Sequence, residues 1–396
     1  MKNLNDKLDL LREKLKKSKT NKTNIMIIGL GSVGGYLLDY LMSGCDENIK
    51  ITVVGRNYEK MLSDVNIVRV SSLIRGLNRT NVEIVSGVDF NDVKALENCI
   101  KEHKPDIIVN SSRAYAGLKY GSISWKNIRA YGIWSPLAIK YIKNIMEAYE
   151  NAHSDAIVIN TSYSDAVIPW LKSAGKAYPD FGSGNLNHLT PRIKFAIAQK
   201  YGIEDFWNID ITYATAHFHD VVISKEGQTE GIEQLICAEY NGKPIEFNAD
   251  EIFSECKIAM PVDAKRNMMN ASSNYEIIKG ILSAVRDGKR VKLHCPGVFG
   301  EIGGYPVIID GSKDKIEAYI DQSKFSLATM RLKNRQSIYL DGIENVENGT
   351  LYYTDELLEK VKNAFGVQLV KSVSFENIGP VADWIVKEII EKYKGS

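Results

Sequence analysis

The chain has 396 residues, of which 44% are hydrophobic, so it can bury a full core and is expected to divide into two main domains. Its 50 lysines and arginines balance 49 acidic residues, so the chain has no excess of positive charge of the kind that binds nucleic acid or an anionic membrane. Five scattered cysteines without a C-x-x-C spacing indicate free thiols in a reducing compartment. The sequence has neither a signal peptide nor an apolar run long enough to cross a bilayer, so a cytoplasmic protein is expected.

Residues 1–23 are predicted to form an N-terminal helical arm and a polar linker. Leu4, Leu8, Leu11 and Leu15 fall on one helical face, which has to be buried against something. The arm could pack on its own domain or on a neighbouring subunit, and the sequence leaves both open.

A short apolar strand that begins at Ile25 breaks into closely spaced glycines. Gly29, Gly31 and Gly34 have the G-x-G-x-x-G spacing of a dinucleotide-binding turn, and a helix is expected after them, over Tyr36–Met42. The first glycine allows the tight turn, the second lets the backbone approach a pyrophosphate, and the third packs the helix on the strand. The helix N-terminus attracts the phosphates. The expected cofactor contacts here are Gly29, Gly31, Ser32, Val33 and Gly34; the alternative is a glycine turn kept only for packing.

The end of the second strand, Ile51–Val54, indicates which dinucleotide is bound. An acidic residue at this point would accept hydrogen bonds from the ribose hydroxyls of NAD, whereas an arginine suits a 2′-phosphate. Arg56 and Asn57 stand here, and no acidic residue occurs before Glu59. We therefore expect NADP, with NAD as the other possibility; the alternative for Arg56 is a solvated surface side chain.

Strands and helices then alternate, which predicts an α/β domain over residues 24–178 with a Rossmann-type, doubly wound parallel sheet. Further strands are expected at Val82–Val85, Ile107–Asn110 and Ala156–Asn160, and the clearest helices at Asp92–His103 and Asn127–Glu150. Ligands bind where strands of such a sheet end. Ser111 and Ser112 therefore join the expected cofactor contacts, and Asn160 becomes a candidate site residue.

The pattern changes near residue 179 to that of an α+β substrate domain, expected over residues 179–333. Its predicted elements are a helix at Leu189–Tyr201, a strand at Ile209–Ala214, a loop rich in His and Asp, antiparallel strands at Val291–Cys295 and Tyr305–Asp310, and a helix at Glu317–Lys333. A C-terminal extension, residues 334–396, adds a strand pair around Asp341–Thr354 and helices at Asp355–Phe365 and Ile378–Tyr393.

The order of these features resembles the lactate/malate dehydrogenase superfamily. Beyond the glycine turn, the resemblance rests on Asn160 at a strand end, on Phe181-Gly-Ser-Gly184 before the helix that carries Arg192, and on Ala214-Thr-Ala-His217. It implies that Asn160 lies near the nicotinamide and a substrate oxygen. It also implies that Arg192 binds the substrate carboxylate, that His217 is the catalytic histidine, and that the protein is a dimer or tetramer.

The departures from the family concern the catalytic machinery. The family pairs its histidine with an aspartate three residues before the arginine, where this chain has Leu189. Phe218 and His219 replace the glycine and aspartate that usually follow the histidine. The segment 113–125 contains no unambiguous match for the arginine that polarises the carbonyl. Transfer of the fold is therefore safer than transfer of the mechanism.

The side chains themselves suit carbonyl reduction. A guanidinium such as Arg192 makes two parallel hydrogen bonds to a carboxylate, and an imidazole such as His217 titrates near neutral pH. The alternatives are an ion pair with a surface acid for Arg192 and a backbone-satisfied loop histidine for His217. His188 and His219 compete with His217 as proton donor, and Asp220 could orient one imidazole.

Other cations could assist the reaction. Arg113 is the candidate for polarising the carbonyl or binding the carboxylate, and Lys126 and Arg129 are weaker candidates. Residues 265–267 could line the substrate pocket or simply begin a helix. His217-x-His219-Asp220 offers metal-ligand types, but no cysteine lies near, and no metal is expected.

We conclude from the sequence that the protein is an NADP-dependent oxidoreductase that transfers a hydride to a 2-oxo acid or related carbonyl. Its partner is expected to be a small-molecule carboxylate, without nucleic acid or membrane. Two alternatives stay open. The C-terminal extension and the missing aspartate fit an amino-acid or opine-type dehydrogenase that acts on an imine, and the missing aspartate also fits a non-catalytic dinucleotide-binding protein.

Overall fold

A six-stranded parallel sheet organises the first half of the protein. The structure is a computed structural model that describes residues 2–17, 22–44, 46–77, 79–115 and 117–393. The strands are β1 (Thr23–Ile28), β2 (Ile49–Val54), β3 (Asn81–Val85), β4 (Ile107–Asn110), β5 (Ile157–Asn160) and β6 (Phe181–Gly182). Their order is β3-β2-β1-β4-β5-β6, so the chain runs to one edge and then returns to build the other. This order confirms the predicted doubly wound, Rossmann-type sheet.

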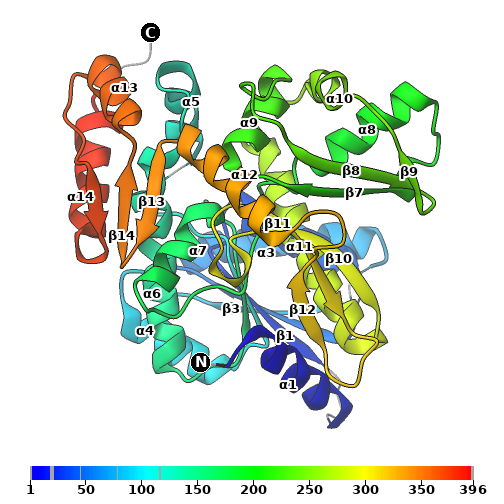
Figure 1. Ribbon diagram of the computed structural model, residues 1–396. Coiled ribbons are helices and arrows are strands. Elements are labelled where there is room, and N and C mark those ends of the chain that lie inside the picture. Colours follow the sequence, from blue (N-terminus) through cyan, green and yellow to red (C-terminus); the bar gives the residue numbers. More distant parts are fainter. Residues whose placement is uncertain (1, 18–21, 45, 78, 116, 394–396) are drawn as a thin grey trace.

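Helices cover both faces of this sheet (Figure 1). They are α2 (Ser32–Ser43), α3 (Tyr58–Ile74), α4 (Val93–His103), α5 (Gly117–Asn127), α6 (Ser135–Asn151) and α7 (Ser164–Ser173), with a 3₁₀ turn η1 (Gly132–Trp134) before α6. Ile25 and Ile27 of β1 join the core that contains α2 and α3, whereas Met26 and Ile28 join the core that contains α4 and α6. Successive side chains of a strand point to opposite faces of the sheet. Because helices cover both faces, both sets of side chains are buried.

The N-terminal helix α1 (Leu4–Lys17) packs against its own chain. Its predicted leucine stripe is buried in the core that also contains β1 and α2. A buried ion pair joins Lys7 to Asp180, with 2.8 Å between Nζ and Oδ2. Of the two placements that the sequence left open, the structure therefore shows the arm on its own chain, and the predicted dimer or tetramer stays a prediction.

Two antiparallel sheets and four helices form the α+β region. The sheets are β7-β8-β9, with β7 (Ile209–Ala214), β8 (Leu235–Tyr240) and β9 (Lys243–Ile245), and β10-β11-β12, with β10 (Arg290–Pro296), β11 (Gly304–Asp310) and β12 (Glu317–Ile320). The helices are α8 (Thr190–Tyr201), α9 (His217–Glu226), α10 (Ala249–Glu255) and α11 (Asn267–Asp287), joined by short turns η2 (Phe206–Asn208), η3 (Ala264–Arg266) and η4 (Val298–Gly300). The predicted α+β region is confirmed.

The C-terminal elements return to the first sheet domain. After α12 (Leu327–Leu340), a sheet β13-β14-β15 forms from β13 (Ile343–Glu347), β14 (Thr350–Tyr353) and β15 (Ser372–Ser374). The remaining helices are α13 (Asp355–Phe365), η5 (Phe375–Asn377), α14 (Ile378–Ile385) and a π-helical turn η6 (Val386–Ile390). In Figure 1 these elements lie beside α6 and α7, and they share one hydrophobic core with them. The extension therefore packs on the sheet domain, and α12 leads the chain across from β12.

Three predicted elements are wrong in detail. The helix expected over 317–333 is strand β12 followed by α12, because Ala318 and Ile320 alternate with exposed residues and Ser326 caps the later helix. The helix expected from Asn127 starts only at Ser135, with Pro136 in its first turn. The loop rich in His and Asp is helix α9, which begins at His217 and ends at a left-handed Gly227.

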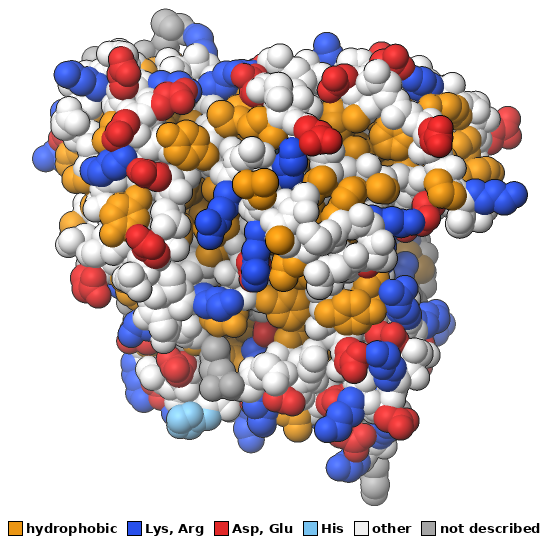
Figure 2. Space-filling view, in the orientation of Figure 1, with side chains coloured by type: hydrophobic (Ala, Val, Ile, Leu, Met, Phe, Trp, Pro, Cys, Tyr) orange, Lys and Arg blue, Asp and Glu red, His pale blue; other side chains and the backbone are white. Residues whose placement is uncertain are grey.

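The domain boundaries stay predictions; the one at residue 333 falls inside α12. Figure 2 shows charged side chains of both signs scattered over one face, in keeping with the net charge of +1. Within the described residues, no helix is both long and apolar enough to span a bilayer. The described cysteines, Cys99, Cys237, Cys256 and Cys295, are free, and Cys45 lies outside the described residues.

Candidate active site

One cavity of about 970 Å³ connects the glycine turn to the α+β region. The parallel sheet contributes the turn after β1, the end of β2 and the segment after β4. The α+β region contributes α8, α9 and the start of α11. The predicted site residues that line this cavity are Gly29, Gly31, Ser32, Val33, Arg56, Asn57, Ser111, Ser112, Arg113, Arg192 and His217. Gly34 and Asn160 are not among its lining residues.

The glycine turn has the geometry that a dinucleotide requires. Gly29 has φ +95°, a left-handed conformation that other residues rarely adopt. A Cβ on Gly34 would collide with the carbonyl oxygen of Gly29, so this glycine sets the contact between helix and strand. At Gly31 a Cβ would meet nothing within 4 Å, so the cavity is open there. Helix α2 starts at Ser32 without a side-chain cap, and its first N–H groups are therefore free to bind an anion.

Arg56 and Asn57 lie at the end of β2, as predicted. Arg56 is exposed and makes no ion pair with the described residues, although its charge helps to lower the pKa of Asp89 after the hydrogen bonds from Asn91. Asn57 is the N-cap of α3, and its side chain accepts a hydrogen bond from the backbone N–H of Lys60 at 2.9 Å. Asn57 therefore has a structural duty, which leaves Arg56 as the side chain free for a ligand.

A buried amide network shapes the ends of β4 and β5. Asn110 donates from Nδ2 to Oδ1 of Asn160 at 2.9 Å, and its own Oδ1 accepts from the Ser112 hydroxyl at 2.6 Å. Nδ2 of Asn160 donates to the carbonyl oxygen of Ser162 and to the Ser164 hydroxyl. The Asn160 side chain is thus fully buried and fully bonded within the protein. This geometry suits holding the loop in place better than direct contact with a ligand.

His217 pairs with an aspartate that the sequence comparison did not identify. Its Nδ1 lies 2.7 Å from Oδ2 of Asp341, the residue that ends α12. A carboxylate only accepts hydrogen bonds, so Nδ1 carries a proton and the other ring nitrogen, Nε2, is the one available for substrate. No described residue bonds Nε2, and His217 lines the cavity. The aspartate missing at Leu189 is therefore replaced by one from the C-terminal part of the chain.

Two tyrosines hold this pair in place. Asp341 is fully buried and also accepts from the Tyr163 hydroxyl at 2.6 Å and from the backbone N–H of Tyr131 at 2.7 Å. The rings of Tyr131 and Tyr163 lie edge-on to the imidazole of His217, with centroids 4.8 and 5.0 Å away. Tyr163 has φ +44°, an uncommon conformation that other contacts must stabilise. The ring and the carboxylate are therefore fixed in one orientation.

The charges around His217 favour its protonated form. Burial opposes the imidazolium, but the carboxylates of Asp341, Asp165 and Asp220 outweigh it and raise the pKa of His217 above its ordinary value. The competing histidine His219 has both ring nitrogens engaged: Nε2 donates to the carbonyl oxygen of Thr229, and Nδ1 bonds the Ser337 hydroxyl. No group of three possible metal ligands occurs within the described residues.

Arg192 lies almost fully buried at the cavity wall. Its Nη1 donates to the carbonyl oxygen of Cys256 at 3.0 Å, and its Nη2 lies 3.0 Å from the sulfur of Met260. Its Nε is buried and has no partner. The alternative for Arg192, an ion pair with a surface acid, is not found, since no described carboxylate lies within 4 Å of the guanidinium. The edge formed by Nε and Nη2 is suited to a carboxylate.

Asp220 and His188 form a second polar pair in the cavity. Oδ2 of Asp220 is 4.0 Å from Nδ1 of His188, and Oδ1 accepts from the backbone N–H of Leu186 at 3.2 Å. Burial raises the pKa of Asp220 to about 6, although His217 and Arg192 oppose the shift. Burial and the charges of Arg266 and Arg192 lower the pKa of His188 to about 3, so this ring is neutral. Asp220 thus faces no cationic partner at bonding distance within the described chain.

This unpaired carboxylate should cost stability. Because the pKa of Asp220 is raised to about 6, its favourable contribution to folding is complete below about pH 4 and is lost as the pH rises through 6. We expect Asp220→Asn to increase the free energy of unfolding by up to ~3 kcal/mol at pH 8 and by little at pH 4. Urea denaturation at both pH values measures this. The control Asp287→Asn, at an exposed position, should change stability by less than ~0.5 kcal/mol at either pH; an equal gain in both variants would contradict the expectation.

Further cations surround the cavity at different depths. Arg113 is exposed after β4, and its guanidinium lies over Gly117. Arg266 is half-buried in η3, and it lines the cavity together with Asn267 at the start of α11, whereas Lys265 does not. Arg129, a weaker candidate, is ion-paired with Glu226 and Glu230 and does not line the cavity.

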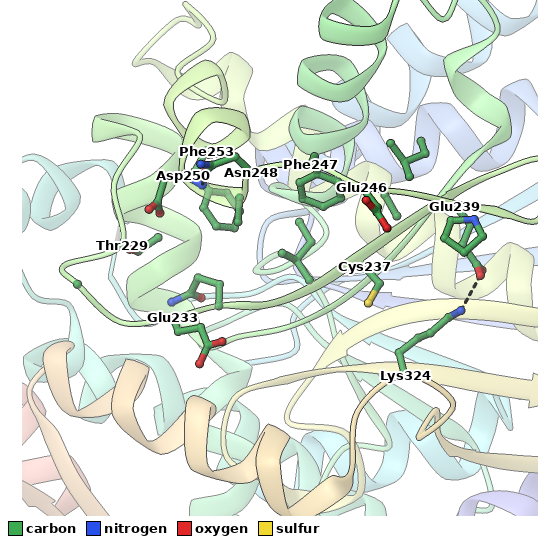
Figure 3. Close-up of a pocket in the computed structure, with 17 residues that line it drawn as sticks. Thr229, Glu233, Cys237, Glu239, Glu246, Phe247, Asn248, Asp250, Phe253 and Lys324 are labelled. Carbon is green, nitrogen blue, oxygen red and sulfur yellow. Dashed lines mark hydrogen bonds and ion pairs between the residues drawn. The ribbon is translucent and has the colours of Figure 1, made fainter.

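A second hollow, of about 860 Å³, lies on the sheet β7-β8-β9 (Figure 3). Figure 3 shows Cys237 on this sheet and the ion pair between Lys324 and Glu239 at one side, at 2.5 Å. Burial raises the pKa of the Cys237 thiol, which makes it a poor nucleophile. The hollow shares no lining residue with the cavity at His217, which remains the candidate active site.

Neither a protein-family model nor a curated protein matches the chain. Solved structures do match. Lactate dehydrogenase from Cryptosporidium parvum, complexed with lactic acid and nicotinamide adenine dinucleotide, is 16% identical, with a TM-score of 0.52 over 81% of this chain and 97% of that chain. Lactate dehydrogenase from Eimeria maxima with NADH and oxamate is 14% identical, with a TM-score of 0.52 over 86% and 95%. Malate dehydrogenase from Aeropyrum pernix is 15% identical, with a TM-score of 0.51 over 80% and 97%. The chain has the fold of these enzymes, as the resemblance implied.

Proposed function

We propose that this protein is a nicotinamide-dinucleotide-dependent oxidoreductase that transfers a hydride to a 2-oxo acid or a closely related carbonyl. The observation that carries this proposal is one continuous cavity that is lined by the glycine turn, Arg192 and His217, with Asp341 bonded to His217 from outside it. Proteins of the same fold include a lactate dehydrogenase with bound lactic acid and nicotinamide adenine dinucleotide, which supports the same chemistry here.

The residues at the glycine turn fit the dinucleotide. The uncapped N-terminus of α2 and the open space at Gly31 would hold its pyrophosphate, and Arg56 would bind a 2′-phosphate, which favours NADP over NAD. When bound, the nicotinamide supplies or accepts the hydride. The Ser111 hydroxyl donates to the carbonyl oxygen of Gly29 at 2.6 Å and so keeps the turn in shape.

The protein side chains divide the remaining work. Arg192 binds the substrate carboxylate with its Nε edge. His217 gives the proton on Nε2 to the carbonyl oxygen, while Asp341 holds the opposite nitrogen and stabilises the imidazolium. Arg113 is the cation that can approach the carbonyl from the segment after β4. Asn160 acts indirectly, through the loop that it supports.

The alternative of a non-catalytic dinucleotide-binding protein loses its ground. It depended on the absence of an aspartate at Leu189, which would leave the histidine without a partner. Asp341 provides that partner through a fully buried carboxylate that accepts from three donors, and this favours a catalytic role for the histidine.

The proposal is tested by following NADPH and, separately, NADH consumption against a panel of 2-oxo acids, each with and without ammonium. Turnover that requires His217, as judged by loss in His217→Ala with unaltered dinucleotide affinity, would support it. Tight dinucleotide binding by calorimetry without turnover on any panel member would overturn it in favour of a binding protein.

Arg56 should decide the cofactor preference. Because a charged hydrogen bond to phosphate contributes about 1.5–3 kcal/mol, Arg56→Ala should weaken NADPH binding by ~10–100-fold and leave NADH binding unchanged. Isothermal titration with both dinucleotides measures this. The matched control is Arg75→Ala, whose guanidinium pairs with Asp39 outside the cavity, and it should bind both dinucleotides like the unmodified protein. Equal loss of NADH affinity in Arg56→Ala would contradict the assignment.

A further inference from the structure

Two buried charges of opposite sign line the candidate active site, and neither has an ionic partner among the described residues. Arg192 is 3% exposed and Asp220 is 4% exposed. Across the described chain, no carboxylate lies within 4 Å of the Arg192 guanidinium, and no lysine or arginine lies within 4 Å of the Asp220 carboxylate. The one ring at 4.0 Å from Asp220 belongs to His188, which is uncharged near neutral pH.

The two groups do not neutralise each other directly. Each affects the pKa of the other, so they lie in one electrostatic neighbourhood, yet they form no hydrogen bond or ion pair. Buried charges are normally paired, because removing a charge from water is unfavourable unless an opposite charge replaces the water. A ligand with one negative and one positive charge can pair with Arg192 and Asp220 at the same time.

The position of Asp220 places the positive charge of that ligand near the reacting atoms. Asp220 follows His217 by three residues on α9, so the two side chains share one helical face. The same face continues along the cavity with Val221, Ser224 and Lys225. Asp220 therefore lies on the same helical face as the proton donor His217, and Arg192 lines the same cavity.

We propose that the substrate is a small zwitterion whose carboxylate binds Arg192 and whose protonated nitrogen binds Asp220. This inference rests on the proposed function and narrows its substrate to an amino acid and the corresponding imino acid. A nitrogen on the reacting carbon is favoured because Asp220 and His217 are neighbours on one face. The Asp220 carboxylate then stabilises the positive charge of the ammonium group that binds and of the iminium group that hydride transfer forms.

The reaction balances with the dinucleotide as the only oxidant. An amino acid R–CH(NH₃⁺)–COO⁻ first loses one nitrogen proton to Nε2 of neutral His217. The carbon then gives a hydride to the oxidised nicotinamide dinucleotide, and the nitrogen lone pair forms the C=N bond of R–C(=NH₂⁺)–COO⁻. Addition of water and cleavage of the carbon–nitrogen bond release the 2-oxo acid and ammonium. The reverse sequence forms the amino acid from the 2-oxo acid, ammonium and the reduced dinucleotide.

The test compares substrates with and without nitrogen. Oxidation of amino acids is followed with NADP⁺ and NAD⁺, and reduction of 2-oxo acids with and without ammonium. The proposal expects turnover of amino acids, and reduction only when ammonium or an amino group on the substrate is present; these two arms show whether the nitrogen is on the reacting carbon. Turnover of nitrogen-free hydroxy acids and 2-oxo acids with no effect of nitrogen would overturn this inference and leave the proposed function intact.

Binding provides a second readout that does not depend on turnover. In the presence of the dinucleotide, amino acids should raise the melting temperature of the unmodified protein, and hydroxy acids of the same skeleton should raise it less. Absence of any shift with amino acids, together with absence of turnover, would overturn the inference. Binding of amino acids without hydride transfer to any substrate would overturn the proposed function, and Arg192 and Asp220 would then form only a binding site for a zwitterion.

Asp220→Asn is the decisive variant because it removes the charge and keeps the shape. The KM for the amino acid should rise by ~10–100-fold, the range for loss of a hydrogen bond to a charged group, while dinucleotide affinity stays unchanged. Asp220→Glu should restore part of the affinity. The control Asp287→Asn, far along the chain on the last turn of α11, should behave like the unmodified protein. A loss in kcat and dinucleotide binding with the same KM would mean that Asp220 is only structural.

Discussion

Replacing Asp341 with asparagine should lower kcat for reduction by ~10²–10⁴-fold, the range for loss of positioned acid–base catalysis. Asparagine keeps the volume and can still accept from the backbone N–H of Tyr131. It carries no charge, however, so it neither stabilises the imidazolium of His217 nor holds Nδ1 as the protonated nitrogen. Dinucleotide affinity should be unchanged, because Asp341 does not line the cavity. Steady-state kinetics with a separate dinucleotide titration measures both quantities.

The pH profile gives an independent check on the same pair. The carboxylate of Asp341 contributes to the raised pKa of His217, so the protonated donor persists to higher pH than an ordinary imidazole. Reduction should therefore decline on the alkaline side with a midpoint above ~6.5, and Asp341→Asn should move this midpoint to lower pH. Stability follows the same sign: the contribution of this pair is complete below ~6.5 and is lost as the pH rises through the raised pKa.

A control at the surface separates this role from a general effect on the C-terminal sheet. Glu344→Gln removes a carboxylate on β13 that pairs with Lys371 at 2.8 Å, two residues after Gly342 and away from the cavity. It should leave kcat and its pH profile unaltered. If Asp341→Asn and Glu344→Gln lowered activity equally, or if the midpoint stayed in place, Asp341 would have only a structural role.

Local patterns in the sequence were sufficient for the sheet domain. Residues a few positions apart produce the apolar runs, the glycine spacing and the polar strand ends. These patterns predicted the doubly wound parallel sheet and the position of the glycine turn. Arg192 and His217 were expected instead from the resemblance to the lactate/malate dehydrogenase superfamily, and both line the same cavity. The helix expected over 317–333 was wrong because strand β12 has only four residues, too few for its alternation to stand out beside the helix that follows.

Asp341 could not be found in this way. It lies 124 residues after His217 and at the end of a helix, and no spacing rule links the two. The one signal in the sequence was negative: Leu189 occupies the position of the expected partner, and an extra C-terminal segment is present. When the aspartate that the family pairs with its histidine is missing and the chain carries an extension, the partner can be sought in that extension. The structure brings them together because α12 returns the chain to the sheet domain.

Arg192→Lys should raise the KM for the acid by ~10²–10³-fold and change kcat less. A guanidinium gives two parallel hydrogen bonds to a carboxylate, each worth about 1.5–3 kcal/mol when charged, whereas a lysine keeps the charge and forms a single point contact. The free Nε of Arg192 is the donor that lysine cannot reproduce. Initial rates over a wide range of substrate concentration, with dinucleotide saturating, measure the effect.

The two other contacts of this guanidinium need their own control. Nη1 and Nη2 hold the segment after α10 through Cys256 and Met260, so any substitution of Arg192 also releases that segment. Met260→Leu removes the sulfur contact and keeps the volume. It should raise KM by no more than a few fold if carboxylate binding is the main duty of Arg192. If Met260→Leu matched Arg192→Lys, the guanidinium would serve chiefly to anchor this segment, and another of the cavity arginines would have to bind the acid. Arg266 would be the first to examine, because it is half-buried and its charge reaches both Arg192 and His188.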